Sequence, residues 1–261
     1  MPDVLSDNRN LWQWAGINFG EYNCMMLQKS LARLASTAGA SNVRLWGKIN
    51  GTEKDFYIAE GTADAPPAGE DEDRNADLEP RGSGVNQFAY WVCNSPDENK
   101  WTALPDLSPS DVAAARSVKF HVTGDLERKI ITNPFFLKRE KHFIRAQIAR
   151  ISQSTTLVPK GVYRINEEQI LEENLPEEGP VPVPSTKEMA KLANWVHYSK
   201  SILKCNRVTL LDVEAAEDED PEVAKAKAEA KDPSEPMLKS IVNDQKVKGN
   251  CSAWTVRCYG D

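Results

Sequence analysis

The sequence is poor in the residues that most often carry metal and acid–base chemistry. It holds three histidines, His121, His142 and His197, which lie far apart along 261 residues. None of them has a Cys, His or carboxylate partner at metal-ligand spacing. Glycine-rich dinucleotide loops, Walker-type phosphate loops and Gly-x-Ser-x-Gly elbows are also missing from the sequence. We therefore expect no catalytic residues, no metal and no cofactor, and hence no enzyme.

Long apolar runs are missing as well. No stretch approaches the roughly 18 residues needed to cross a bilayer. Within the first thirty residues, Trp12, Trp14, Asn18 and Glu21 interrupt the apolar stretch that a signal peptide requires. The five cysteines are odd in number and scattered, which is typical of free thiols in a reducing compartment. We expect a protein of the cytoplasm, or of a structure assembled there, with no membrane partner.

A concentrated basic surface is a third absence. The net charge is −7, and the longest basic stretch, residues 138–142, is short and broken by Glu140. Phosphate binding requires clustered Lys and Arg, so nucleic acid is excluded as a partner. The composition, 40% hydrophobic and 27% charged, is that of a protein that folds at least in part.

The clearest local signal that is present is a β-hairpin around Asn50-Gly51. Residues 43–49 and 52–60 have strand patterns, and Asn-Gly favours a two-residue type I′ turn because both central residues need positive φ. This register pairs apolar with apolar residues, and oppositely charged side chains with each other. The predicted pairs are Leu45 with Phe56, Val43 with Ile58, Lys48 with Glu53, and Arg44 with Tyr57.

Three helices are predicted from periodicity and capping residues. Residues 22–36 carry one apolar stripe, with Gly39 placed for a left-handed stop. Ser108 followed by Pro109 starts a second helix that runs through about Arg116. A capping box at 185–188 opens a third, with apolar residues on one side as far as Leu203.

Further strands complete the prediction. Residues 87–93 and 101–104 form a second hairpin, and residues 254–259 a last strand. Residues 143–158 are ambiguous: Ile144, Ile148 and Ile151 fit a helix, whereas Ile144, Ala146 and Ile148 fit strand alternation. We interpret this segment as two strands separated by residues 152–155.

The fold class predicted from these patterns is α+β, with antiparallel hairpins, a few packed helices and long acidic loops. The expected organisation is an N-terminal helix and hairpin (1–60), an acidic flexible loop (61–84), an α+β core (85–211) that includes an acidic Pro-rich loop (167–184), a charged low-complexity linker (212–236) and a C-terminal strand segment (237–261).

Aromatic residues are the most distinctive content, with seven tryptophans. Most lie in segments with strand or helix pattern and are expected in a core. The predicted register instead places Trp46 on the charged face of the hairpin together with Tyr57, where a partner could cover it. The candidate interface residues are Trp46, Tyr57, Trp195 and His197.

Several blocks resemble one known family, the radial spoke head proteins of types four and six. Residues 45–60 resemble its tryptophan-glycine-lysine hairpin, and residues 84–94 with 101–105 its next block. The likeness continues in the same order along the chain and covers roughly residues 10–205. The acidic insertion between the first two blocks also occurs in that family. The later blocks are 115–120, 123–126, 143–152, 159–163 and 192–197.

This resemblance implies a structural subunit of the radial spoke head in the axoneme of motile cilia and flagella, which relays mechanical signals between the central pair and the dynein arms. The implied partners are paralogous head subunits of types four, six and nine, the spoke stalk and central pair projections, with a homo- or heterodimer expected. An alternative is a cytosolic protein–protein adaptor that uses the same fold outside the axoneme. The family pattern continues beyond an element like residues 254–257, so we expect this chain, which stops at Asp261, to be truncated or shortened.

Overall fold

The computed structural model describes residues 3–14, 16–62, 78–97, 100–165, 171–176, 179, 181–182, 184–197, 206–208, 225, 238–244 and 252–258. The chain divides into two compact units, Met1–Ala149 and Arg150–Asp261. Both combine helices with antiparallel strands, which confirms the predicted α+β class. Most of the expected acidic loop 61–84 and nearly all of the expected linker 212–236 lie outside the described residues, as does part of the expected loop 167–184.

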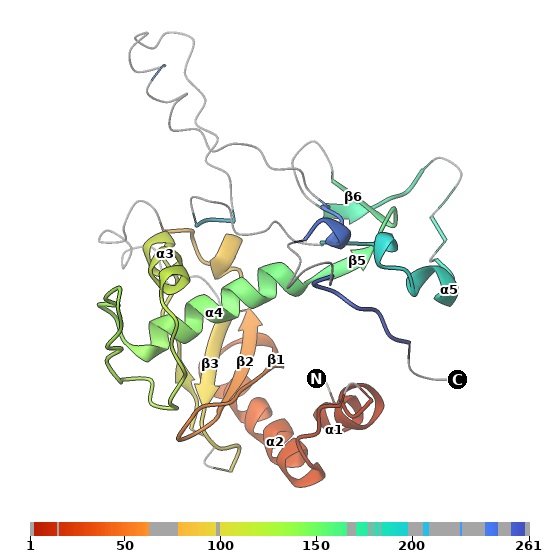
Figure 1. Ribbon diagram of the computed structural model, residues 1–261. Coiled ribbons are helices and arrows are strands. Elements are labelled where there is room, and N and C mark those ends of the chain that lie inside the picture. The colour runs from red at the N-terminus through yellow and green to blue at the C-terminus, as the bar shows by residue number, and fades with distance from the viewer. Residues whose placement is uncertain are drawn as a thin grey trace. The chain divides into compact units, whose positions relative to one another are not determined.

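A four-stranded antiparallel sheet in the order β1-β2-β3-β4 is the frame of the first unit (Figure 1). The inner strands β2 and β3 are buried almost throughout. The second predicted hairpin is confirmed, since β3 pairs with β4 through Trp91 and Ala103. The strand bounds are β1 Ser41–Ile49, β2 Phe56–Thr62, β3 Ala89–Cys93 and β4 Thr102–Ala103.

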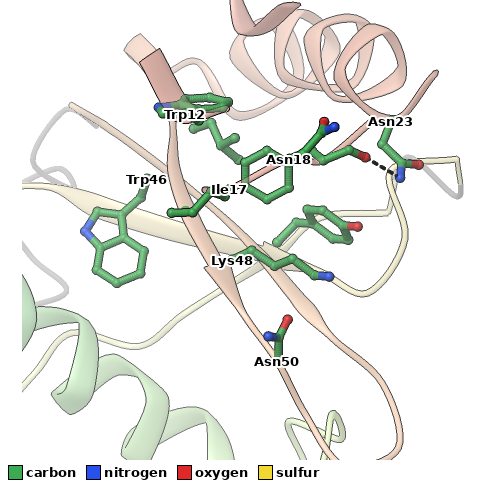
Figure 2. Close-up of a pocket in the computed structure, with 11 residues that line it drawn as sticks. Trp12, Ile17, Asn18, Asn23, Trp46, Lys48 and Asn50 are labelled. Atoms are coloured by element: carbon green, nitrogen blue, oxygen red, sulfur yellow. Dashed lines mark hydrogen bonds between the residues drawn. The ribbon is translucent and has the colours of Figure 1, made fainter. Parts of the chain in front are cut away.

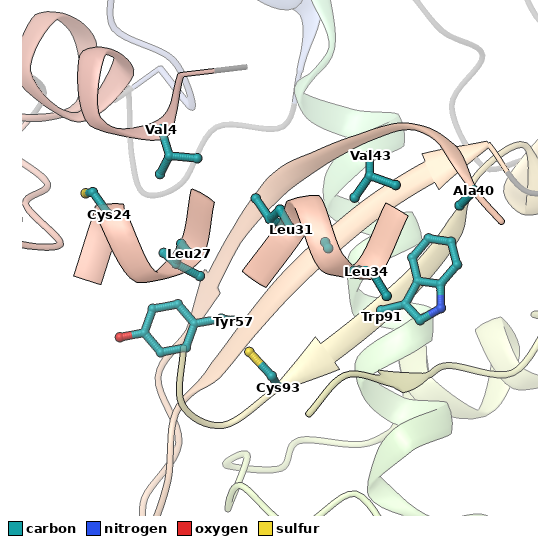
Figure 3. Packing of buried hydrophobic residues seen from close by; sticks show 11 residues of the cluster. Val4, Cys24, Leu27, Leu31, Leu34, Ala40, Val43, Tyr57, Trp91 and Cys93 are labelled. Carbon is teal, nitrogen blue, oxygen red and sulfur yellow. The ribbon is translucent and has the colours of Figure 1, made fainter. Parts of the chain in front are cut away.

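The helices α2 (Glu21–Ala38) and α4 (Glu140–Thr155) cover the two faces of this sheet. Leu27 and Leu31 of α2 pack over the face that carries Tyr57 (Figure 3). Ile144 and Ile148 of α4 pack over the opposite face, in a cluster with Phe56, Ile58, Tyr90 and Val92. Because both faces are covered, β2 and β3 alternate between two cores instead of between core and water.

The first hairpin exists, but its predicted turn and register are wrong. A six-residue loop from Asn50 to Asp55 joins the strands, with Ile49 opposite Phe56 and Lys48 opposite Tyr57. The cause is tertiary. The amides of Thr52, Glu53 and Lys54 donate to the carbonyls of Val122 and Thr123 at 2.8–3.0 Å, and this pairing with a distant segment outweighs the local turn preference.

A β-bulge between Leu45 and Gly47 has a second effect on the hairpin. It directs Leu45 into the cluster on the α2 side, whereas Trp46 packs against the cluster on the α4 side. Trp46 is therefore half-buried, and not on a charged face as the simple register predicted.

The other helices of the first unit follow their capping residues. Helix α2 ends at Gly39, which has φ +61°, as predicted. Ser108 and Asp111 form a reciprocal capping box at the start of α3 (Pro109–Ser117). The N-terminus adds α1 (Val4–Asp7) and the helical turn η1 (Asn8–Trp12), and η2 (Gly84–Asn86) precedes β3.

The prediction of two strands in residues 143–158 is wrong, because α4 occupies most of that segment. The four residues from Phe143 to Ala146 are all buried. The sheet covers Ile144, while the ring of Phe143 contacts Phe120 and Phe136 edge-to-face. A helix enclosed on several sides has no single apolar stripe, so its sequence also fits strand alternation.

The second unit contains two short strand pairs. β5 (Leu157–Pro159) pairs with β8 (Trp195–His197), and β6 (Tyr163–Ile165) pairs with β7 (Leu171–Glu173). The capping box of Ser185 and Glu188 is confirmed and opens α5 (Thr186–Met189). The remaining short turns of this unit are η3 (Leu192–Asn194) and η4 (Ile241–Asn243).

The predicted continuation of that helix toward Leu203 is wrong. Helix α5 stops at Met189, where the indole Nε1 of Trp195 donates to the carbonyl of Met189 at 2.8 Å, and the side chain of Asn194 donates to that of Glu188 at 2.8 Å. These bonds satisfy the terminal carbonyls and lead into β8. Residues 198–205 lie outside the described residues. The strand predicted at 254–259 is also wrong over its described part, since residues 254–258 form none.

Candidate functional site

A groove of about 800 Å³ lies beside β1 in the first unit (Figure 2). One wall comes from the segment that precedes α2, with Trp12, Ile17 and Phe19. The other comes from the first hairpin, with Trp46 and Tyr57. Apolar and polar groups share the surface of the groove about equally. The polar lining residues are Asn18, Asn23, Lys48 and Asn50.

Asn8 shapes the wall formed by the N-terminal segment. Its side chain is fully buried and accepts a hydrogen bond from the amide of Phe19 at 3.1 Å, while its Nδ2 donates to Asn18 at 3.2 Å. The ring of Phe19 packs edge-to-face on Trp12 at 5.3 Å and lies 6.4 Å from the ring of Tyr57. A buried, hydrogen-bonded side chain thus fixes an otherwise irregular segment against the hairpin.

The groove runs along the free edge of β1. Among the strands that the structure describes, β1 is the outermost of the sheet and pairs only with β2. Four successive residues, from Leu45 to Lys48, border the groove. Because successive strand side chains point to opposite faces, a groove that touches all four follows the strand's edge. An outer strand edge beside a groove with apolar side chains is a typical acceptor for an extended segment of another chain.

The charges in the groove are already paired. Lys48 Nζ lies 2.7 Å from Asp55 Oδ2 and 5.4 Å from the centre of the Tyr57 ring. The hydrogen bond to Asp55 raises the pKa of Lys48, and the same bond lowers the pKa of Asp55. Burial raises the pKa of Tyr57. At neutral pH the lysine is therefore charged and the phenol neutral, which suits binding and leaves neither group poised to transfer a proton.

The structure brings two of the four candidate interface residues together. Trp46 and Tyr57 border the groove, Trp46 half-buried and Tyr57 buried. Trp195 and His197 lie in the second unit on β8. His197 is buried, and its Nε2 lies 2.9 Å from Asp244 Oδ2.

Sequence reasoning missed the contribution of Ile17 and the three asparagines to the groove. The signal available was the pair Trp12 and Phe19, whose aromatic side chains precede α2 and fold back toward the sheet. No recognisable sequence pattern indicated that the buried side chain of Asn8 would form hydrogen bonds with Asn18 and Phe19.

Over the described ranges, no group of three or more His, Cys, Asp or Glu side chains is placed to hold a metal ion. In the same part of the chain, none of the helices is both long enough and apolar enough to span a membrane. The thiols of Cys24 and Cys93 are buried, and that of Cys258 is exposed.

Over the described residues, the first unit is an antiparallel sheet covered on both faces, with its outer strand β1 beside a groove. Comparison with known proteins identifies the family of the chain. The family model described as "Radial spokehead-like protein" matches residues 1–79 and 64–260, and the chain belongs to this family, as its sequence blocks indicated.

Named relatives agree with this assignment. Radial spoke head protein 6 homolog A of Xenopus tropicalis is 30% identical over 268 residues, covering 84% of this chain and 49% of the relative. The protein of the same name from Mus musculus is 32% identical over 195 residues, covering 67% of this chain and 27% of the relative. Flagellar radial spoke protein 4 of Chlamydomonas reinhardtii is 30% identical over 231 residues, covering 82% of this chain and 49% of the relative. The chain spans between about a quarter and a half of the length of these curated relatives.

Proposed function

We propose that this chain is a structural subunit of the radial spoke head in the axoneme of motile cilia and flagella. The observation that carries this proposal is the family match, which extends through both compact units. The sheet enclosed by α2 and α4 supports it, because a module with two packed cores can transmit force without rearranging its fold. In this role the chain helps to relay mechanical signals between the central pair and the dynein arms.

Deletion of the chain in a flagellated cell that expresses it tests this function. We expect axonemes whose spoke heads are incomplete by electron microscopy, together with altered beating. Intact spoke heads and normal swimming in the deletion mutant would eliminate the proposal. The alternative, a cytosolic adaptor, is favoured instead if the chain is found entirely in the detergent-soluble fraction and co-purifies with no other spoke protein.

We further propose that the groove beside β1 receives an extended segment of a neighbouring head subunit, with Trp46 and Tyr57 among the contacts. Backbone pairing to the open edge of β1 would supply affinity, and the apolar residues of the lining would select side chains.

Trp195 and His197 have a different proposed part in the second unit. The ring of Trp195 is half-buried and remains a candidate contact. The buried His197 connects β8 to Asp244 by a hydrogen bond. We propose that it positions β8, which carries Trp195, and does not itself contact a partner.

Gly47 allows the groove to be filled without disturbing the core. It borders the groove, its φ lies in the ordinary range, and a Cβ built on it meets no atom within 4 Å. Gly47→Leu should therefore leave the melting temperature unchanged. We expect it to weaken association of the full chain with axonemes lacking the endogenous protein by at least about tenfold, or about 1.4 kcal/mol.

The matched control is Gly47→Ala, which adds one methyl group and should bind as the parent chain does. Equal association of the parent, Ala and Leu chains would show that the groove is not a docking site. It would leave the structural role in the spoke head standing.

A further inference from the structure

The loop of residues 129–139, between α3 and α4, exposes three large apolar side chains. Ile131, Phe135 and Leu137 are 88%, 81% and 97% exposed. Single exposed apolar residues are common on protein surfaces, but three of them within seven residues of one loop indicate an interaction site. The loop lies beside α3 and the start of α4 (Figure 1).

The exposed side chains are held by buried neighbours within the same loop. Ile130 and Phe136 are only 4% and 3% exposed. Phe136 packs edge-to-face on Phe143 of α4 with ring centres 5.9 Å apart. Inward and outward side chains thus alternate, so a stable fold requires Ile130 and Phe136 but not the three exposed residues.

Backbone pairing fixes the base of the loop. Lys129 and Arg139 form an antiparallel bridge, and the amides of Glu140 and Lys141 donate to the carbonyls of Arg128 and Leu126 at 3.0 and 3.1 Å. At the tip, the hydroxyl of Thr132 donates to the carbonyl of Pro134 at 2.9 Å. A tip that is ordered before it meets a partner loses little conformational entropy on binding.

The loop also carries the opposite charge from the chain as a whole. Residues 127–141 contain five Lys or Arg and two Asp or Glu, a net charge of +3, whereas the entire chain has −7. One of the two acids, Glu140, is buried. The other, Glu127, pairs with both Arg139 and Lys141, while Arg128 and Lys138 pair with Glu53 and Asp111, which lie outside residues 127–141. Counting these two partners lowers the net charge from +3 to +1. The basic rim of the loop therefore keeps a smaller positive excess, in which Lys129 forms no ion pair with a carboxylate of the described residues.

We propose that the 129–139 loop inserts Ile131, Phe135 and Leu137 into an apolar groove of a second protein whose surrounding surface is acidic. A second copy of this chain is disfavoured at the tip, because two such loops brought together would oppose their positive rims. A fixed, shaped tip also fits a protein groove better than a fluid bilayer, which offers no complementary cavity. This surface is additional to the groove beside β1 and does not depend on it.

Photo-crosslinking in the flagellated cell tests this inference on the full chain. The probe is p-benzoyl-phenylalanine in place of Phe135, and the control carries it in place of Leu175, an exposed residue of the second unit. We expect position 135 to form an adduct with one other protein, through a peptide rich in Asp and Glu, and position 175 to form no such adduct.

Two further variants show whether the apolar tip and the basic rim both matter. Ile131→Ser combined with Leu137→Ser, and separately Lys129→Glu, should each reduce the adduct at position 135 by at least tenfold. Melting temperatures should stay unchanged, because these side chains are not part of the core. Undiminished adduct in either variant, an adduct with lipid or with a second copy only, or no adduct at position 135, would overturn the inference.

The outcome for the loop can be separated from the outcome for the proposed function. An acidic partner that is not an axonemal protein supports the loop contact and counts against a role in the spoke head. Incorporation of the chain into spoke heads without the adduct overturns the loop contact alone.

Discussion

Replacing Glu140 should destabilise the first unit more than replacing any exposed acid nearby. Its carboxylate is fully buried in the first turn of α4. It accepts hydrogen bonds from the amides of Thr123 and Gly124 at 2.9 and 3.0 Å, and from the hydroxyl of Thr123 at 2.6 Å. The same two residues border the hairpin loop that carries Lys54, so one carboxylate connects α4 to the hairpin beside the groove.

The magnitude follows from the donors that would be left behind. Glu140→Ala strands two buried amides, and each unsatisfied buried donor costs about 1–3 kcal/mol. Release of the buried charge from its desolvation penalty offsets part of this loss. We expect a net destabilisation of about 3 kcal/mol for Glu140→Ala and about 1 kcal/mol for Glu140→Gln, which retains one acceptor oxygen.

Urea unfolding of the full chain measures these differences, and hydrogen exchange at the Gly124 amide localises them. Glu127→Gln is the matched control, because Glu127 forms ion pairs on the surface and should matter little. If Glu140→Ala lowered the free energy of unfolding no more than Glu127→Gln does, the claim that the Glu140 carboxylate stabilises the contact between α4 and the hairpin would be refuted.

Two other predictions concern pH and backbone strain. Burial lowers the pKa of His142 below its ordinary value of 6.5, so the folded chain binds fewer protons there than the unfolded chain. The contribution of His142 to stability is thus complete above pH 6.5 and is lost as the pH falls through the pKa of the folded state. His142→Gln should therefore reduce the dependence of the urea midpoint on pH in this range. An unchanged slope of the urea midpoint against pH would contradict the assignment. Gly124 has φ +108°, and a Cβ built on it would lie 2.4 Å from the carbonyl oxygen of Lys54. Gly124→Ala should therefore lower the free energy of unfolding, measured by thermal unfolding, by about 1–3 kcal/mol. Gly47→Ala is the control, because a Cβ at Gly47 meets no atom within 4 Å and should leave the stability unchanged.

Local signals in the sequence were sufficient for the elements whose ends are set by their own residues. Helices α2, α3 and α5 begin or end where Gly39, Ser108 and Ser185 indicated. Capping depends on hydrogen bonds within one turn of chain, so it can be recognised without knowledge of the rest of the fold.

The failures occurred where distant segments decide the outcome. The Asn50-Gly51 dipeptide favours a tight turn, but pairing of the loop with residues 122–123 widened it and shifted the register. Helix α4 is enclosed by the sheet and by Phe120 and Phe136, which obscured its periodicity. Trp46, which was predicted on a charged face with Tyr57, packs instead in the hydrophobic cluster on the α4 side.

The same limit applies to the candidate site. Trp46 and Tyr57 were predicted as candidate interface residues from aromatic content and strand pattern, and both border the groove. The second wall is created by the buried Asn8, whose role appears only once the chain is folded. The exposed tip at Ile131, Phe135 and Leu137 was missed because an apolar run in sequence gives no indication of which residues face water.

Cryo-electron tomography of axonemes that contain a tagged version of this chain tests its proposed role most directly. After the deletion strain is complemented with the tagged chain, subtomogram averages should show extra density on the head of the radial spoke and restored beating. Extra density at any other axonemal site, or a tagged chain that restores swimming while remaining wholly outside the axoneme, would contradict the assignment of this chain to the spoke head.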